Sequence, residues 1–110
     1  ELAGVRPGFR PDGRSFARAL EGSRWRGPPG VLLEYVGDPH LPRWWAVRTR
    51  DLVYIETADG TRELYDLTGR LGPADPYQLD NRADHRRYRA AQERLAALLE
   101  ELRSANAGRR

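Results

Sequence analysis

Residues 44–67 constrain the fold of this 110-residue chain more than any other stretch. Two sets of side chains alternate from 45 to 49 and again from 52 to 57, and such a period of two is typical of half-buried strands. Asp59 and Gly60 then supply two residues that tolerate positive φ in a tight hairpin, and residues 62–67 are a returning strand rich in Leu and Tyr. The stretch predicts an antiparallel meander of at least three strands.

A fourth strand is predicted at residues 31–36, a continuous apolar run between two glycines. We expect this strand to be buried. Its one charged residue is Glu34, and an ionised carboxylate resists burial unless it is paired. Glu34 therefore points to solvent, lies at an edge of the sheet, or pairs with an arginine such as Arg48, and a structural pair is favoured over a catalytic role.

The C-terminal third of the chain predicts a long amphipathic helix that begins at a cap among residues 80–84 and ends near Ser104. Its apolar side chains recur at spacings of three and four and so share one face, which comprises Tyr88, Ala91, Leu95, Leu98, Leu99 and Leu102. This face should pack across the sheet. The expected fold is α+β, a four-stranded antiparallel sheet packed by a long C-terminal helix.

The first thirty residues are expected to be an extended leading segment with a short helix. Three glycines and two prolines fall within residues 1–13, which indicates extended structure. A short helix is predicted at residues 16–22, with Asp12 or Ser15 as its cap and Gly22 at its end. The expected organisation is thus 1–30 as a linker segment, 31–104 as the sheet and helix, and 105–110 as a frayed tail.

Composition excludes several kinds of chemistry. The chain contains no Cys, so disulfides, thiolate metal sites and Cys nucleophiles are ruled out. His40 and His85 are the only histidines and give no metal-ligand spacing. There is no Gly-rich phosphate loop, and no serine has the context of a nucleophile elbow. We expect no catalytic residue, metal site or cofactor in this chain itself.

The charge pattern argues against nucleic acid as a partner. The net charge of +3 comes entirely from arginine, because the chain has no Lys. These arginines are spread along the chain beside 16 acidic residues, rather than gathered into a phosphate-binding stripe. No apolar run approaches the roughly 18 residues of a membrane span.

The residues at the N-terminus lack the basic and apolar segments of a signal peptide. The chain is therefore cytoplasmic or Glu1 is not its native start, and we favour the second alternative.

The order of short motifs resembles the C-terminal region of type I sulfatases, which are arylsulfatase-like members of the alkaline phosphatase superfamily. Members of this family often carry Ala-Val-Arg-Thr, then Lys-Tyr-Ile, Glu-Leu-Tyr-Asp-Leu, Asp-Pro, Glu and Asn-Leu before a closing helix. The chain has Ala-Val-Arg-Thr at 46–49, Glu-Leu-Tyr-Asp-Leu at 63–67 and Asp-Pro at 75–76. It departs from the pattern at Val53, Gln78 and Arg82 and in the longer connection at 68–74. A family-like Asp-Gly-Arg-Ser at 12–15 lies where sulfatases link the catalytic domain to this subdomain.

The resemblance implies that a larger N-terminal domain carries out catalysis and that this chain has a supporting role. The family's nucleophile is a formylglycine made from Cys or Ser in a Cys-X-Pro-X-Arg type motif, and no such motif occurs here. Formylglycine and calcium are therefore expected in the absent catalytic domain, which is the expected partner. This chain would support the fold and shape the pocket rim without catalysing by itself. Family members are often secreted, periplasmic or lysosomal.

The loop at residues 37–43 carries the candidate substrate-binding residues. If it lies at the pocket rim as in sulfatases, His40 and Arg43 could contact a sulfated or carboxylated substrate, and Trp44 could stack on a sugar or aryl ring. The structural alternative for each is a solvated His, an Arg packed on a Trp, and a Trp that anchors a core or interface. Adjacent strand residues point to opposite faces, so Trp44 and Trp45 cannot both fill one core.

A second function from a different class stays open. The same sheet and helix could form a stand-alone binding module that recognises an anionic glycan or a protein through Trp44, Arg43 and His40.

Overall fold

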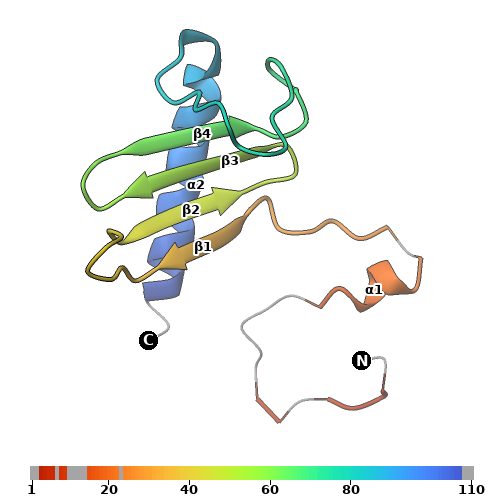
Figure 1. Ribbon diagram of the computed structural model, residues 1–110. Helices are drawn as coiled ribbons and strands as arrows, with labels where there is room; N and C mark the ends of the chain where they lie inside the picture. The colour runs from red at the N-terminus through yellow and green to blue at the C-terminus, as the bar shows by residue number, and fades with distance from the viewer. Residues whose placement is uncertain (1–2, 7, 10–14, 23, 108–110) are drawn as a thin grey trace.

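The computed structural model describes residues 3–6, 8–9, 15–22 and 24–107 (Figure 1). Its elements in chain order are α1 (Ala17–Leu20), β1 (Val31–Tyr35), β2 (Trp44–Arg48), β3 (Leu52–Thr57), β4 (Arg62–Asp66), the 3₁₀ helix η1 (Arg86–Tyr88) and α2 (Arg89–Ala107). The strands form one antiparallel sheet in the order β1-β2-β3-β4. Figure 1 shows α2 running across one face of this sheet. The predicted α+β fold, a four-stranded sheet with a long C-terminal helix and a short N-terminal one, is confirmed.

Local side-chain chemistry sets the turns between the strands. Between β3 and β4, Gly60 has a φ of 91° and the carboxylate of Asp59 accepts a hydrogen bond from the N–H of Thr61 at 2.9 Å. Between β2 and β3, the hydroxyl oxygen of Thr49 accepts from the N–H of Leu52 at 3.0 Å. Both turns are tight, so the strand pairing follows the sequence order.

The core lies between α2 and one face of the sheet. Its buried cluster comprises Val47, Leu52, Tyr54 and Leu64 from the sheet and Tyr88, Ala91, Leu95 and Leu99 from the helical region. The predicted apolar face of the helix is therefore the face that packs. Gly30 lies at the margin of this layer, where an added Cβ would be 2.7 Å from a methyl of Val47 and 3.1 Å from one of Leu98. The chain passes too close to the core there for a side chain.

β1 differs from its prediction as a buried strand. It is one of the two edge strands of the sheet, and two of its apolar side chains are exposed, Val31 by 52% and Leu33 by 40%. Its position at the edge explains how Glu34 avoids a burial cost: the carboxylate is exposed and accepts a hydrogen bond from the Asn106 amide at 3.2 Å. An apolar run reveals a strand but does not say whether another element covers it.

The two ends of the chain match the expectations in part. Neither predicted cap is confirmed: the residue at the start of α1 is Phe16, with no side-chain cap, although the Ser15 hydroxyl accepts from the N–H of Ala17 at 3.2 Å. Gly22 comes two residues after α1 with a φ of 75°, and Asp12 lies outside the described residues. α1 is a single turn with Ala17 as its one buried residue. α2 continues to Ala107, beyond the expected end, and the last three residues of the chain are outside the described part. No helix in the described ranges is long and apolar enough to cross a membrane.

Candidate functional site

The loop between β1 and β2 holds the candidate substrate-binding residues in a defined conformation. The carboxylate of Asp38 accepts hydrogen bonds from the N–H groups of His40 at 2.7 Å and Leu41 at 2.8 Å, and from the hydroxyl of Tyr35. The Tyr35 hydrogen bond is the main reason that the pKa of Asp38 is lowered, and the two N–H groups add to it. Gly37, with a φ of 87°, brings the loop back against Arg43. His40 therefore sits exposed on an ordered turn.

The structure places the three candidates in different surroundings. The guanidinium of Arg43 lies 4.8 Å from the ring centre of Trp45, on the helix-facing side, where Arg103 also stacks on that ring at 4.1 Å. Trp44 lies on the opposite face with its ring centre 6.0 Å from that of Tyr35. Arg43 and Trp44 are thus not brought together. The predicted divergence of Trp44 and Trp45 is observed, with Trp45 on the helix side.

The face of the sheet that points away from α2 is largely apolar. The alternation that buries Val47, Tyr54 and Leu64 turns the intervening residues to this side. The open face, as we use the term, is the apolar part of this side: Val31, Leu33, Tyr35, Trp44, Ala46, Val53, Ile55 and Tyr65. The register places Arg48, Thr57 and Glu63 on the same side. In the described part of the chain, no helix lies across it (Figure 1). Burial by neighbouring groups, and then the hydrogen bond to Glu63, raise the pKa of Tyr65 to about 12.

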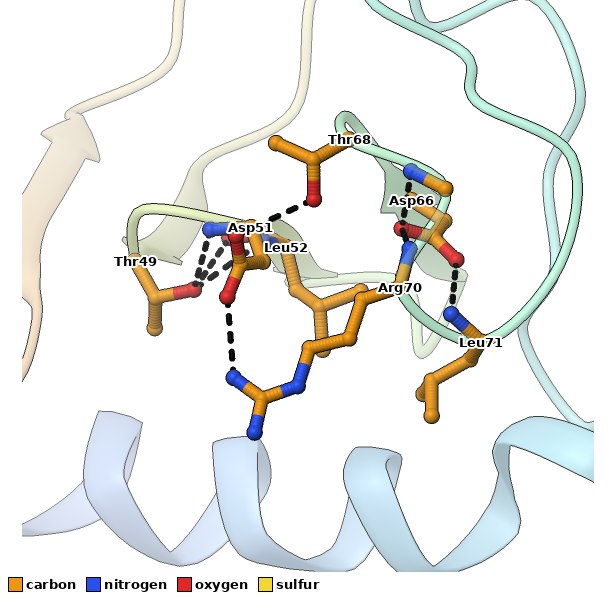
Figure 2. Close-up of polar contacts among 8 residues, drawn as sticks. Thr49, Asp51, Leu52, Asp66, Thr68, Arg70 and Leu71 are labelled. Atoms are coloured by element: carbon orange, nitrogen blue, oxygen red, sulfur yellow. Dashed lines mark hydrogen bonds and ion pairs between the residues drawn. The ribbon is translucent and has the colours of Figure 1, made fainter.

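Asp66, in the sulfatase-like Glu-Leu-Tyr-Asp-Leu motif, organises the loop that follows β4 (Figure 2). Its carboxylate is only 1% exposed and accepts the N–H groups of Gly69, Arg70, Leu71 and Gly72 at 2.8–3.0 Å. The hydroxyl of Tyr88 donates a further bond at 3.2 Å, which ties this loop to the helical region. An anion surrounded by backbone N–H groups stabilises a loop without any cation. The motif aspartate is a structural residue.

Asp75 of the Asp-Pro motif and Asn81, which stands at the Asn of the family's Asn-Leu, act in the same way. Asp75 accepts the N–H groups of Leu79 at 3.0 Å and Asp80 at 2.9 Å, and its pKa is lowered chiefly by the bond from Leu79. Asn81 accepts from the N–H of Leu64 at 3.0 Å and donates to the carbonyl oxygen of Arg62 at 3.0 Å. Asn81 therefore pins the approach to η1 against the edge strand β4.

The described residues do not offer a place for the catalytic groups of a sulfatase. Among them, no cluster of three or more His, Asp or Glu side chains could hold a metal ion, so they do not fit calcium. The chain also has no Cys, and none of its serines stands in the X-Pro-X-Arg context from which formylglycine is made.

A second polar cluster, centred on Asp51, is not predictable from the sequence. Asp51 in the β2–β3 turn accepts hydrogen bonds from Arg70 at 2.9 Å and from the Thr68 hydroxyl at 3.0 Å (Figure 2). The Arg70 bond is the largest cause of the lowered pKa of Asp51. The side chains are seventeen to nineteen positions apart, so the only sequence signal was the polar Thr-Arg-Asp turn.

Comparison with known proteins identifies the fold. No protein-family model matches the chain, and no curated protein matches it significantly. Among solved structures, a protein from Bacteroides thetaiotaomicron VPI-5482 assigned to the sulfatases is similar over 96% of this chain and 23% of its own, with 24% identity and a TM-score of 0.79. BT1596, a 2-O GAG sulfatase, is similar over 92% of this chain and 22% of its own, with 25% identity and a TM-score of 0.77.

A third structure agrees with these two. It is BT4656 in complex with its substrate D-glucosamine-2-N,6-O-disulfate, similar over 94% of this chain and 22% of its own, with 24% identity and a TM-score of 0.79. The chain thus spans less than a quarter of the length of these proteins. The similarity expected from its motifs is confirmed in three dimensions, and the chain has the fold of a sulfatase subdomain.

Proposed function

We propose that this chain is the C-terminal subdomain of a type I sulfatase-like sulfuric ester hydrolase, in which it supports the fold and lines the pocket rim without catalysing by itself. The observation that carries the proposal is the match itself: nearly the whole chain superimposes on 22–23% of three sulfatase chains. A subdomain of that share leaves the remainder of the enzyme to supply the nucleophile and calcium.

The open face supports this proposal because it provides a surface for the remainder of the enzyme. It carries Trp44, Tyr35 and Ile55, which are half-buried, beside the exposed Leu33. A contiguous apolar surface of this kind is typical of a protein interface. The occupant that we propose is the N-terminal catalytic domain of the same protein. The solved sulfatases have more than three quarters of their length outside the region that this chain matches, which is room for such a domain.

The side of the sheet on which each candidate lies reduces the number of residues that can form the pocket rim. Trp44 points to the open face, and His40 lies on the loop that leads into β2. These two residues are the better candidates for contact with a sulfate ester held by a domain docked on that face. Arg43, stacked on Trp45 on the helix side, would reach such a substrate only after leaving the ring.

The proposal is tested by purifying the native protein with an antibody against this segment and determining its mass and activity. We expect a mass several times the 12.6 kDa of this chain, and hydrolysis of an aryl sulfate in the presence of calcium. The 110-residue chain alone, assayed in the same way, should show no turnover. A native mass near 12.6 kDa would overturn the proposal and leave the stand-alone binding module, and turnover by the chain alone would contradict its non-catalytic role.

A further inference from the structure

Three arginines from separate parts of the chain converge on one cavity between α2 and the β2–β3 turn. Arg50 comes from this turn, Arg70 from the loop after β4, and Arg94 from α2. The cavity measures about 610 Å³, within the range of roughly 300–1,000 Å³ that is usual for small-molecule sites. We call it the arginine cavity.

The charges around the arginine cavity are not balanced. Among the described residues that line it, Asp51 is the only acidic one, and its carboxylate is occupied by Arg70 at 2.9 Å and by Thr68. The Arg50 side chain is attracted to Asp51 only through space, and in the described ranges no hydrogen bond or ion pair joins the side chain of Arg50 or Arg94 to another residue. Both residues are exposed and line the same cavity, so two arginines with no side-chain partner among the described residues border one space.

The sequence of α2 explains why Arg94 has no ion-pair partner on its own helix. Its neighbours three and four positions away are Ala90, Ala91, Ala97 and Leu98, and none is acidic. Arg103 on the same helix differs, because Glu100 three positions earlier lies 3.6 Å away.

The floor of the arginine cavity is apolar. Leu52 and Leu95 are buried there, and Leu71 and Leu98 are half-buried at its margin. A small inorganic anion would contact the arginines and leave the leucine side chains exposed to water. An anionic group attached to an apolar body would contact the arginines and also bury the leucine side chains. The shape thus favours an organic anion over a free ion.

We propose that the arginine cavity binds an organic sulfate or carboxylate, with the anionic group held by Arg50 and Arg94 and a ring-sized apolar body on the leucine floor. Guanidinium groups match both anions because their planar forks donate two parallel hydrogen bonds. The site goes beyond the proposed function. It lies at the β2–β3 end of the sheet, whereas His40 and the rest of the predicted rim lie at the β1–β2 end.

The test is a titration of the isotope-labelled 110-residue chain with 2-naphthyl sulfate, followed by amide chemical shifts in NMR spectra. We expect saturable shifts at residues 49–52, 70–71 and 94–98. Arg50→Gln and Arg94→Gln should each weaken binding by roughly tenfold, the usual effect of losing a hydrogen bond to a charged group. Arg86→Gln is the matched control, since Arg86 is exposed in η1 and lies outside the cavity lining.

Two further ligands separate the parts of the proposal. Neutral 2-naphthol should bind much more weakly than its sulfate ester, and so should sodium sulfate. Equal binding of naphthol would overturn the role of the arginines, and equal binding of sodium sulfate would overturn the role of the leucine floor. An absence of shifts, or unchanged affinity in the Arg50→Gln/Arg94→Gln double variant, would overturn the site as a whole.

Discussion

Asp66 is the single residue on which the loop after β4 depends most. Asp66→Asn keeps the shape of the side chain but replaces one oxygen with an NH₂ group that cannot accept the N–H groups now bound to it. We expect the free energy of unfolding to fall by about 3 kcal/mol, because several buried donors lose a charged acceptor. Urea unfolding followed by tryptophan fluorescence measures this loss.

Asp59→Asn is the matched control for this substitution. Asp59 is exposed in the β3–β4 hairpin and accepts the backbone N–H of Thr61. Its replacement should change the free energy of unfolding by less than about 0.5 kcal/mol. Equal effects of the two substitutions would mean that the buried network around Asp66 does not stabilise the fold.

The sequence predicted the side of the sheet to which some side chains point, but not the contacts that they make there. The opposite orientation of Trp44 and Trp45 followed from strand geometry alone, and the structure agrees. The stacking of Arg43 on Trp45 rather than Trp44 could not be resolved, because it depends on the side of the sheet to which the loop delivers the arginine. The role of Asp66 could not be predicted either, because its hydrogen bonds depend on how the backbone of residues 69–72 folds around the carboxylate.

At the scale of elements, the strands and the helix were predictable because their signals are local. Alternation and the hairpin at Asp59 and Gly60 define β2, β3 and β4, and the three-and-four spacing defines the packed face of α2. The burial of β1 was mispredicted because burial depends on strand order and on what covers each face. A strand's own residues carry neither piece of information.

The two faces of β1 give a test of the open face. Leu33 points to the open face, whereas its neighbour Leu32 lies on the helix side and packs against the core. Leu33→Glu should reduce self-association of the 110-residue chain, because it places a charge on an exposed apolar surface, and should leave the free energy of unfolding nearly unchanged. Leu32→Glu should instead lower the free energy of unfolding by about 2 kcal/mol, because it brings a charge to the core.

Sedimentation velocity and urea unfolding of the two β1 variants measure these effects. The parent chain should associate as its concentration rises, and Leu33→Glu should remain monomeric over the same range. A parent chain that is monomeric throughout, or equal destabilisation by both substitutions, would show that the open face is not an apolar surface in need of cover.

At the scale of the whole molecule, several carboxyl groups have lowered pKa values and several phenols have raised ones. Together these shifts determine the pH range over which the folded state is most stable. Hydrogen bonds to the carboxylates lower the pKa values of Asp38, Asp51, Asp59 and Asp75 below the ordinary 3.8. Burial raises the pKa values of Tyr54 and Tyr88 above the ordinary 10.0, with the hydrogen bonds to Glu56 and Asp66 as the next causes. Burial likewise raises the pKa of Tyr65.

The sign of each contribution follows from linkage between protonation and folding. A carboxylate with a lowered pKa stabilises the folded state at pH values above its unfolded pKa, and this stability is lost as pH falls below about 4. A phenol with a raised pKa stabilises the folded state below its unfolded pKa, and this stability is lost as pH rises above about 10. We therefore expect the urea midpoint to fall below about pH 4 and again above about pH 10. The alkaline unfolding should be accompanied by a cooperative rise in tyrosinate absorbance.

Tyr54→Phe isolates the alkaline part of this behaviour. The substitution removes one buried phenol and its hydrogen bond to Glu56 at 2.8 Å, so the variant should be less stable at pH 7 yet lose less further stability above about pH 10. Urea midpoints of parent and variant at matched pH values provide the comparison. Parallel curves through the alkaline range would mean that Tyr54 does not contribute to alkaline unfolding, and a rising midpoint in the parent would contradict the sign derived from the raised phenol pKa values.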